Sequence, residues 1–381
     1  MTLYLGDNEL ETLNCIGKGA ESKVYKYTED SLLKIFLSSI DADAKREKIE
    51  LLMSLPLPDN VVKPDELVYV NGKFAGYKMK YISGAPNLHE VQKPLYRKNH
   101  NLSEKDLLDI CFALGNTIKE LHSLGIVLGD IRSYNFLLKD KEVYFIDIDS
   151  WGFKHRENLL PDAYTADTIP PYCFDKNGKI TFSQNADIYG YAIVAFNTLT
   201  SIHPFDGYYP NMPKMSVTDR MKHGISVLGN HNVRVPKTVP LWNWMSNNLK
   251  DTFLEVFEKK NQSVDVLSAI AQEVGTLVYC AIHNVYYNSS QKCKYCLAET
   301  QTIYSLGDTL TYKSPEFLSE TEIGENPLLA YHSDATVVLL PNVYIDAKNR
   351  LDFVSHSNSG KTKHDTFSLK PMIKGEWVLE T

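Results

Sequence analysis

The segment LGDIRSYNFLL, residues 128–138, and the apolar run that follows it carry oxygen-bearing side chains at informative spacings. Asp130 and Asn135 are five residues apart, and Asp147 ends the run VYFID twelve residues later. Phosphoryl transfer needs a carboxylate that orients a hydroxyl, together with oxygen ligands for a hard cation such as Mg²⁺. We therefore expect Asp130 to accept the hydroxyl proton, Asn135 and Asp147 to bind Mg²⁺ (or Mn²⁺), and Arg132 to neutralise the transferred phosphate.

A glycine-rich stretch, IGKGAESKVYK, lies upstream between two predicted strands. It has the pattern Gly17-x-Gly19-x-x-Ser22-x-Val24. Because it joins two strands rather than a strand and a helix, it does not fit the dinucleotide-binding fingerprint, whose phosphate rests on a helix N-terminus. It fits a hairpin whose backbone N–H groups cover the phosphates of a nucleotide. Glycine is common in strand turns, so this pattern alone is weak evidence.

Lys34 lies in the apolar strand LLKIF, ten residues after Val24. It is either an edge-strand lysine that faces solvent or a lysine that holds the α- and β-phosphates and is itself held by a glutamate of the next helix. Glu47 and Glu50 are both candidates for that glutamate. We prefer Glu47, since Leu51 one turn later can pack beneath the site. Asp149 is a further magnesium ligand or a structural hydrogen-bond acceptor.

The elements that must position these residues divide into two parts. Residues 1–83 predict a small, mainly antiparallel sheet with one long helix at 41–55, and Asn71-Gly72 predicts a hairpin turn. From residue 84 to 275 the pattern becomes mostly helical. The helices are expected at 103–125, 186–200, 214–225, 241–258 and 263–273.

The composition indicates a globular protein and argues against several other classes. A chain of 381 residues with 43% hydrophobic and 23% charged residues can bury two or three cores. The net charge of -7 does not favour binding to nucleic acid or to a membrane surface. The longest apolar run, YAIVAF at 191–196, is too short to cross a bilayer, and the first residues lack the basic start of a signal peptide. Six cysteines in so long a chain do not form a disulfide framework, so we expect a cytoplasmic protein. Its oligomeric state is not indicated.

Taken together, these motifs resemble the eukaryotic-type (Hanks-type) Ser/Thr protein kinase superfamily, in a divergent bacterial-like branch, from about residue 12 to about residue 272. The resemblance implies an α+β, two-lobed protein-kinase-like fold, with ATP as the phosphate donor and proteins as acceptors. YKMKYISG resembles the hinge, which makes Met79 the gatekeeper and places Tyr81 within the adenine-contacting backbone. In SQNADIYGYAIVAF, Asp187 matches the acid that braces the catalytic loop.

The sequence departs from this family at several positions. The third glycine is Ser22, and Gly129 replaces the arginine that usually contacts a phosphorylated activation loop. The magnesium motif is Asp147-Ile148-Asp149 instead of Asp-Phe-Gly, and TIPPYCF lacks the glutamate of the Ala-Pro-Glu element. These departures argue against regulation by activation-loop phosphorylation. They leave two alternatives open: a small-molecule phosphotransferase of the aminoglycoside or choline type, and a non-catalytic pseudokinase scaffold.

The tail after residue 275 carries a second pattern. Cys280-x2-His283-x9-Cys293-x2-Cys296 has the spacing of a tetrahedral zinc site, and we expect structural Zn²⁺ in a zinc-ribbon-like segment at 276–300. Residues 301–381 alternate short apolar runs with turns and predict a small β-rich module. By its position, this module is a candidate for docking protein substrates. HSNSGKTKHD, at 356–365, lacks the upstream glycine of a phosphate loop and is expected to be a mobile basic loop.

Overall fold

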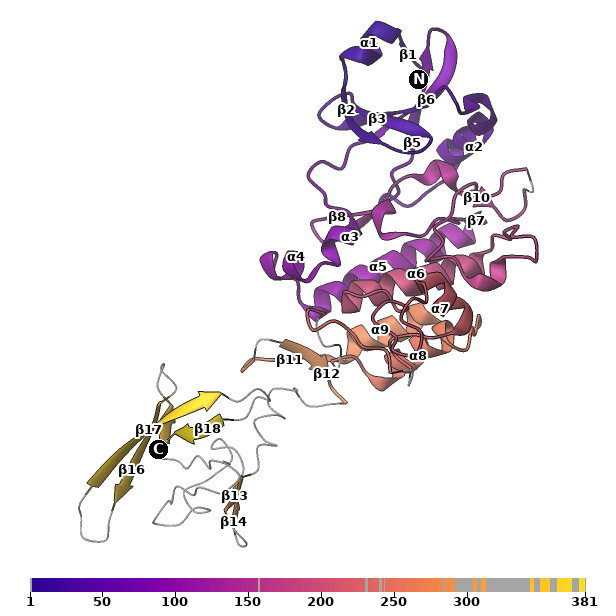
Figure 1. The fold of residues 1–381 in the computed structure, drawn as a ribbon. Helices are drawn as coiled ribbons and strands as arrows, with labels where there is room; N and C mark the ends of the chain where they lie inside the picture. The colour runs from indigo at the N-terminus through magenta and orange to yellow at the C-terminus, as the bar shows by residue number, and fades with distance from the viewer. Residues whose placement is uncertain are drawn as a thin grey trace. The chain divides into compact units, whose positions relative to one another are not determined.

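The computed structural model describes most of the first 293 residues and several strands beyond them (Figure 1). The described ranges are 2–156, 158–229, 232–239, 242, 244–283, 285–290, 293, 304–306, 310–312, 343–345, 350–356, 362–371 and 377–380. Among these residues, none of the helices has the length and apolar character that crossing a membrane requires.

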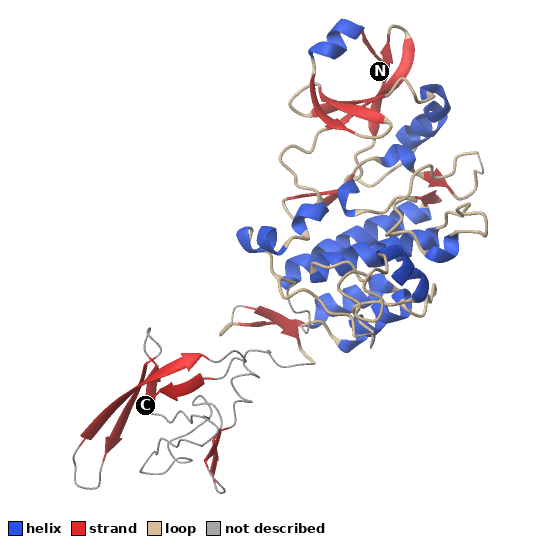
Figure 2. Ribbon diagram, viewed as in Figure 1, coloured by secondary structure: helices blue, strands red, loops and turns tan. Residues whose placement is uncertain are grey.

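The N-terminal lobe is a six-stranded sheet in the order β1-β5-β6-β4-β3-β2, with a long helix α2 (Ala42–Ser54) beside it (Figures 1 and 2). All neighbours pair antiparallel except β1 with β5, which are parallel. The parallel pair and a short helix, α1 (Asp7–Thr12), were not predicted from the sequence. The strands are β1 (Leu3–Leu5), β2 (Asn14–Lys18), β3 (Ser22–Lys26), β4 (Ser31–Phe36), β5 (Pro64–Val70) and β6 (Lys73–Lys80).

Local sequence explains the main features of this lobe. The β5–β6 hairpin turns at Asn71 and Gly72, whose φ angles are 50° and 80°. Two successive positive φ angles are the requirement of a type I′ turn, so the predicted hairpin is confirmed. The side chain of Asp41 accepts a hydrogen bond from the backbone of the first turn of α2. Ile49 and Leu52, fully buried, attach this helix to the core.

The C-terminal lobe is a helical bundle around one large apolar core (Figure 2). Helix α5 begins with a capping box in which Ser103 and Asp106 exchange hydrogen bonds, as predicted. Phe196, Phe253 and Phe257 pack at the centre, with α6 contributing the first and α8 the other two. The helices are α3 (Leu88–Val91), α4 (Pro94–Asn99), α5 (Glu104–Ser123), α6 (Gln184–Thr200), α7 (Val217–His223), α8 (Asn247–Phe257) and α9 (Val266–Thr276).

Short strands and turns between α5 and α6 carry the predicted chemistry. β7 pairs with β10, and β8 pairs with β9, as two small antiparallel ladders. Their bounds are β7 (Ile126–Val127), β8 (Phe136–Lys139), β9 (Glu142–Phe145) and β10 (Gly152–Phe153), with single 3₁₀ turns η1 (Ser133–Asn135), η2 (Ile148–Ser150) and η3 (Pro171–Cys173). All five predicted helices of this lobe are present, although α8 begins at Asn247, after the N-cap Ser246, rather than at 241.

The chain divides into two compact units, one of Met1–Tyr279 with Val285–Gln291 and one of Cys280–Asn284 with Lys292–Thr381. β11 (Leu277–Cys280) pairs with β12 (Val285–Asn288). Further along, β15 (Val343–Ile345), β16 (Arg350–His356), β17 (Thr362–Pro371) and β18 (Trp377–Glu380) form an antiparallel sheet, and β13 (Tyr304–Leu306) pairs with β14 (Leu310–Tyr312). The described residues beyond 300 thus lie in strands, and the small β-rich module at 301–381 stays a prediction. The centre of the predicted basic loop lies outside the described residues.

Candidate active site

A cleft of about 840 Å³ opens between the sheet of the first lobe and the turns that precede α6. This volume lies within the range of small-molecule and cofactor sites in proteins. The cleft brings together every site residue predicted for phosphoryl transfer except one, Glu47. Those at its wall are Gly17, Gly19, Ser22, Val24, Lys34, Met79, Tyr81, Asp130, Arg132, Asn135 and Asp147.

The glycine-rich hairpin forms one side of the cleft. β2 and β3 pair through Gly17 and Val24, and the N–H of Gly19 donates to the carbonyl of Ser22 at 2.8 Å. The turn is therefore closed by its own backbone bond and places Ala20 and Glu21 at its tip. Small residues at this turn leave room for a ligand to approach the backbone.

The predicted hinge lies at the end of β6. Met79 is buried and borders the cleft, as a gatekeeper would. The N–H of Tyr81 donates to the carbonyl of Asp30 at 2.8 Å, so this group is engaged within the lobe. Lys80 and Ile82, on either side of Tyr81, also border the cleft. Adenine contact through these two residues stays a prediction.

Lys34 sits at the back of the cleft, inside the sheet. Its side chain is 7% exposed, and its ammonium contacts the carboxylates of Asp147 and Asp149. Tyr77, the cross-strand neighbour of Lys34 on β6, donates its hydroxyl hydrogen to Asp149 Oδ1 at 2.8 Å. Burial opposes the charge of Lys34, but the surrounding Tyr77, Asp149 and Asp147 raise its pKa well above the ordinary value. Lys34 is therefore a paired, buried cation, and the solvent-facing alternative is wrong.

Glu47 does not reach Lys34. Its side chain is 59% exposed and faces Arg156 at 3.8 Å. The prediction failed because the rotation of α2 is set by Ile49 and Leu52, which point into the core, and not by Leu51. On a helix of 3.6 residues per turn, that rotation turns Glu47 away from the cleft.

Two lysines occupy the inward face of α2 in place of a glutamate. Lys48 is buried, and its ammonium contacts Asp162 Oδ2 and the carbonyl of Leu160, both at 3.0 Å. Lys45 contacts Glu21 of the glycine-rich hairpin and lies 3.5 Å from Asp162. Helix α2 thus holds the activation segment, defined here as residues 158–168, by positive charge.

The catalytic-loop candidates form one hydrogen-bonded group. The side-chain amide of Asn135 donates to the backbone carbonyl of Asp130 at 3.0 Å and to its Oδ2 at 3.1 Å. Arg132 Nε lies 3.1 Å from the same Oδ2 and donates to Asn135 Oδ1 at 3.2 Å. The other carboxylate oxygen, Oδ1, accepts a hydrogen bond of 2.6 Å from the hydroxyl of Thr165. An aliphatic hydroxyl therefore reaches Asp130 from the activation segment.

Asp187 anchors this loop from helix α6, as the resemblance implied. It is buried, and its two oxygens accept from the N–H groups of Leu128 and Gly129 at 2.8 and 2.9 Å. His122 Nε2 lies 2.9 Å from the same carboxylate. The backbone immediately before Asp130 is held by these bonds.

The structure explains why a glycine at position 129 precedes the catalytic-loop aspartate. The φ of Gly129 is +77°, and a Cβ placed there would lie 2.5 Å from Cβ of Pro161. Gly152 approaches the same proline, since its Cβ would lie 2.2 Å from the backbone nitrogen of Pro161. The activation segment therefore crosses the catalytic loop at a point where an arginine, or any other side chain, would not fit.

The oxygen donors predicted to hold Mg²⁺ suit that ion. Asp147 adopts a left-handed conformation with φ of 63°, which an aspartate tolerates better than most residues, and its side chain is 40% exposed. Asn135 offers a neutral oxygen at the same cleft. Carboxylate and amide oxygens are preferred ligands of Mg²⁺, so the donor set fits.

Comparison with known proteins decides the family. The protein kinase domain family matches residues 10–265, which is more than half of the chain. The chain belongs to the protein kinase family. The predicted superfamily and the two-lobed fold are thereby confirmed.

Among curated relatives, the chain is similar to Protein kinase YegI of Escherichia coli K12, with 23% identity over 79% of this chain and 51% of the relative. The YegI of Escherichia coli O157:H7 is 24% identical over 83% of this chain and 54% of its own length. Human Ribosomal protein S6 kinase alpha-1 is 24% identical over 62% of this chain and 31% of its own length. The chain thus spans about half the length of the YegI relatives and less of the human one.

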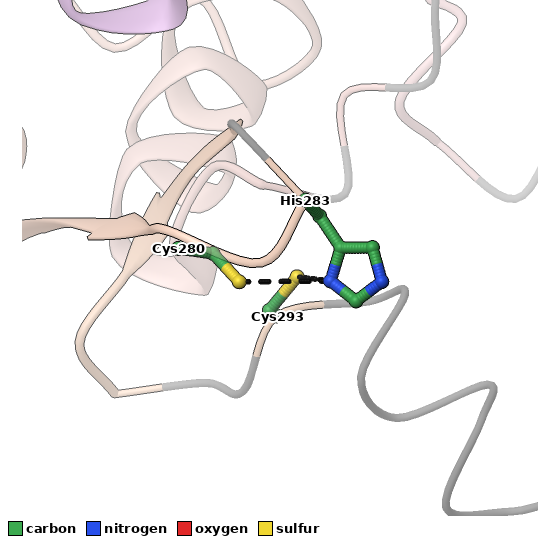
Figure 3. A group of neighbouring side chains, drawn as sticks. All are labelled: Cys280, His283 and Cys293. Atoms are coloured by element: carbon green, nitrogen blue, oxygen red, sulfur yellow. Dashed lines mark hydrogen bonds between the residues drawn. The ribbon is translucent and has the colours of Figure 1, made fainter.

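Beyond the kinase domain, three of the four predicted zinc ligands lie together (Figure 3). His283 Nδ1 lies 3.6 Å from Cys280 Sγ and 3.7 Å from Cys293 Sγ. A tetrahedral zinc with bonds of about 2.3 Å to sulfur and about 2.05 Å to nitrogen separates S and N by about 3.6 Å. A hydrogen bond from the backbone N–H of His283 is the main cause that lowers the pKa of the Cys280 thiol to about 6, which favours the metal-binding thiolate. Cys296 lies outside the described residues.

Residues of the kinase domain that contribute to the site without having been predicted include Tyr77, Lys45, Lys48 and Thr165. Tyr77 lies opposite Lys34 because β6 pairs with β4, and α2 and β5 separate these strands along the chain, so the β5–β6 hairpin could not have revealed this contact. Lys48 and Thr165 carry no local signal. Their roles depend on where the activation segment lies, and that segment has no regular pattern.

Proposed function

We propose that this chain is an ATP- and magnesium-dependent protein kinase that transfers the γ-phosphate to serine or threonine hydroxyls. One observation carries the proposal: Asp130 accepts a hydrogen bond of 2.6 Å from the Thr165 hydroxyl while Asn135 and Arg132 contact its other oxygen. A carboxylate in this environment is suited to orient an acceptor hydroxyl and to take its proton. The names of the relatives, Protein kinase YegI and Ribosomal protein S6 kinase alpha-1, support proteins as acceptors.

Several further residues of the cleft have a part in this proposal. Lys34 neutralises the α- and β-phosphates from the back of the cleft, and the backbone of Gly17 and Gly19 covers them. Arg132, 3.1 Å from Asp130, compensates the charge of the transferred group. Asn135 and Asp147 would hold Mg²⁺, which supplies charge neutralisation at the phosphate oxygens.

The decisive experiment incubates the full chain with γ-labelled ATP and Mg²⁺, together with either basic and acidic protein substrates or a panel of amino sugars and amino alcohols. We expect label on serine or threonine of proteins, and loss of transfer in Asp130→Asn and Lys34→Ala. Gly178→Ala, a surface turn variant, serves as the control with unchanged activity. Label on the small alcohols alone would support the small-molecule phosphotransferase. ATP binding without any transfer would support the pseudokinase scaffold.

We also propose a structural zinc ion held by Cys280, His283, Cys293 and Cys296. The separations of sulfur and nitrogen among the three described ligands support tetrahedral coordination. With four protein ligands, no position remains for a reacting water, so the ion would stabilise the fold of its segment. The cytoplasmic location and the docking of substrates by residues 301–381 stay predictions.

A further inference from the structure

Lys34 has no carboxylate partner on helix α2 among the described residues, and this raises the question of what positions it. We propose that Asp149 is the positioning residue for Lys34 and takes the part that the sequence assigned to Glu47. The proposal rests on the proposed function, since it concerns how the chain presents Lys34 to the phosphates of ATP.

Burial is the first argument. The Asp149 side chain is 4% exposed and that of Lys34 is 7% exposed, so both charges are removed from water. Such a pair persists only where further hydrogen bonds satisfy the remaining polar atoms. The hydroxyl of Tyr77 supplies one, because it donates to the same oxygen of Asp149 that Lys34 contacts. Lys34 and Tyr77 are opposite each other on β4 and β6, so the sheet fixes both groups against Asp149.

The contrast with Asp147 is the second argument. Asp147 also contacts Lys34, but its side chain is 40% exposed and borders the cleft. If Asp147 serves as a magnesium ligand, part of its charge is directed to the cation rather than to Lys34. Asp149 would keep Lys34 in place in that state. Asp147 would thus bind the cation, and Asp149, two residues later, would hold the lysine.

The inward face of α2 is the third argument. Lys45 and Lys48 face the activation segment and contact Asp162, and Glu47 points to Arg156. The inward face of α2 thus presents lysines that are paired with Asp162, and it offers no carboxylate to the ammonium of Lys34 among the residues that the structure describes. Asp149 lies in the turn η2 of the magnesium motif and supplies Lys34 with the carboxylate that helix α2 does not present.

The test compares Asp149→Asn with Glu47→Gln. The second variant is the matched control, because it also removes one negative charge but does so at an exposed side chain. ATP affinity is measured by calorimetry without Mg²⁺, and KM for ATP, kcat and the Mg²⁺ concentration at half-maximal rate are measured by steady-state kinetics. We expect Asp149→Asn to weaken ATP binding about 10- to 100-fold and to raise KM and the magnesium requirement more than it lowers kcat, because Lys34 is left with Asp147 alone. Glu47→Gln should stay within about twofold of the wild type. A wild-type ATP affinity in Asp149→Asn together with a loss of about 10- to 100-fold in Glu47→Gln would overturn the proposal.

Thermal unfolding separates positioning from folding. If Asp149→Asn does not fold, Tyr77→Phe tests the same contact, since it removes one hydroxyl from Asp149 without changing charge. We then expect about a two- to fivefold rise in KM for ATP, and an unchanged KM would contradict the proposal. A wild type that binds ATP without transferring phosphate contradicts the proposed function alone. An active wild type with unchanged affinity in Asp149→Asn contradicts the assignment of Asp149 alone.

Discussion

Replacing Gly129 with alanine tests why the catalytic loop carries a glycine before its aspartate. The added Cβ would lie 2.5 Å from Cβ of Pro161 and 3.2 Å from the carbonyl oxygen of Ala163, in a backbone with φ of +77°. The left-handed conformation costs an alanine roughly 1–2 kcal/mol, and forcing one extra carbon into a packed site costs about 1–3 kcal/mol more. We therefore expect Gly129→Ala to lower the free energy of unfolding by about 2–5 kcal/mol.

Gly178→Ala is the matched control. Its φ is +79°, nearly that of Gly129, but a Cβ there meets nothing within 4 Å. The control should lose roughly 1–2 kcal/mol, the cost of the backbone conformation alone. Urea denaturation of the full chain, followed by tryptophan fluorescence, gives both values. Equal losses in the two variants would refute the idea that the activation segment packs against Gly129.

Gly129→Ala should also impair catalysis if that packing positions Asp130. Displacement of Pro161 would move the segment that carries Thr165, whose hydroxyl contacts Asp130. We expect a lower kcat with little change in KM for ATP, because Lys34 and the glycine-rich hairpin, which contact the nucleotide phosphates in the proposed function, lie on the other lobe. Gly178→Ala should keep the wild-type kcat.

Further predictions concern the metal sites, the phosphate contact and the acid stability of α5. Asp147→Ala should abolish phosphate transfer while ATP binding without Mg²⁺ persists, and full activity would reject its role as a ligand. Cys293→Ser should reduce bound zinc from about one equivalent to below about half, as measured by plasma emission spectrometry, and an unchanged low content in both proteins would exclude the site. Ser103→Ala should cost about 1 kcal/mol of stability, because the α5 cap loses its hydroxyl. Burial raises the pKa of Asp106, but its hydrogen bonds with Lys141 and Ser103 outweigh burial and lower that pKa below its ordinary value. The ionised Asp106 therefore stabilises the fold above its unfolded pKa, and this stabilisation is lost as pH falls through its folded pKa. Urea titrations at neutral and acidic pH should therefore show a smaller acid-induced loss in Ser103→Ala than in the wild type.

Much of the fold follows from local patterns. Helix α5 was predictable because Ser103 and Asp106 form a capping box ahead of an apolar stripe, and these signals are contained within one turn or one face. The Asn71-Gly72 hairpin was predictable for the same reason, since the turn type is set by two residues. β1 was missed, because a parallel pairing of three residues with β5 depends on a partner more than sixty residues away.

The candidate site likewise contains residues that the sequence could indicate and one that it could not place. Lys34, Asp130, Asn135 and Asp147, which border one cleft, could be chosen as candidates by residue type, order and spacing, because the chemistry of phosphoryl transfer restricts which side chains can act. Glu47 was wrongly placed, because residue types alone do not set the rotation of a helix about its axis. Two neighbouring positions on α2 differ by about 100°, so choosing the inward face requires knowing which residues the core accepts.

The sequence by itself determined which groups are available for chemistry and in which elements they lie. Only the tertiary structure decided that Asp149 and Tyr77 meet Lys34, that Lys48 holds Asp162, and that Pro161 lies against Gly129. These contacts join segments separated by many residues, and each depends on burial and close packing that no local pattern specifies. Gly129 illustrates the difference: its type is visible in the sequence, but its reason is a neighbour 32 positions further along the chain.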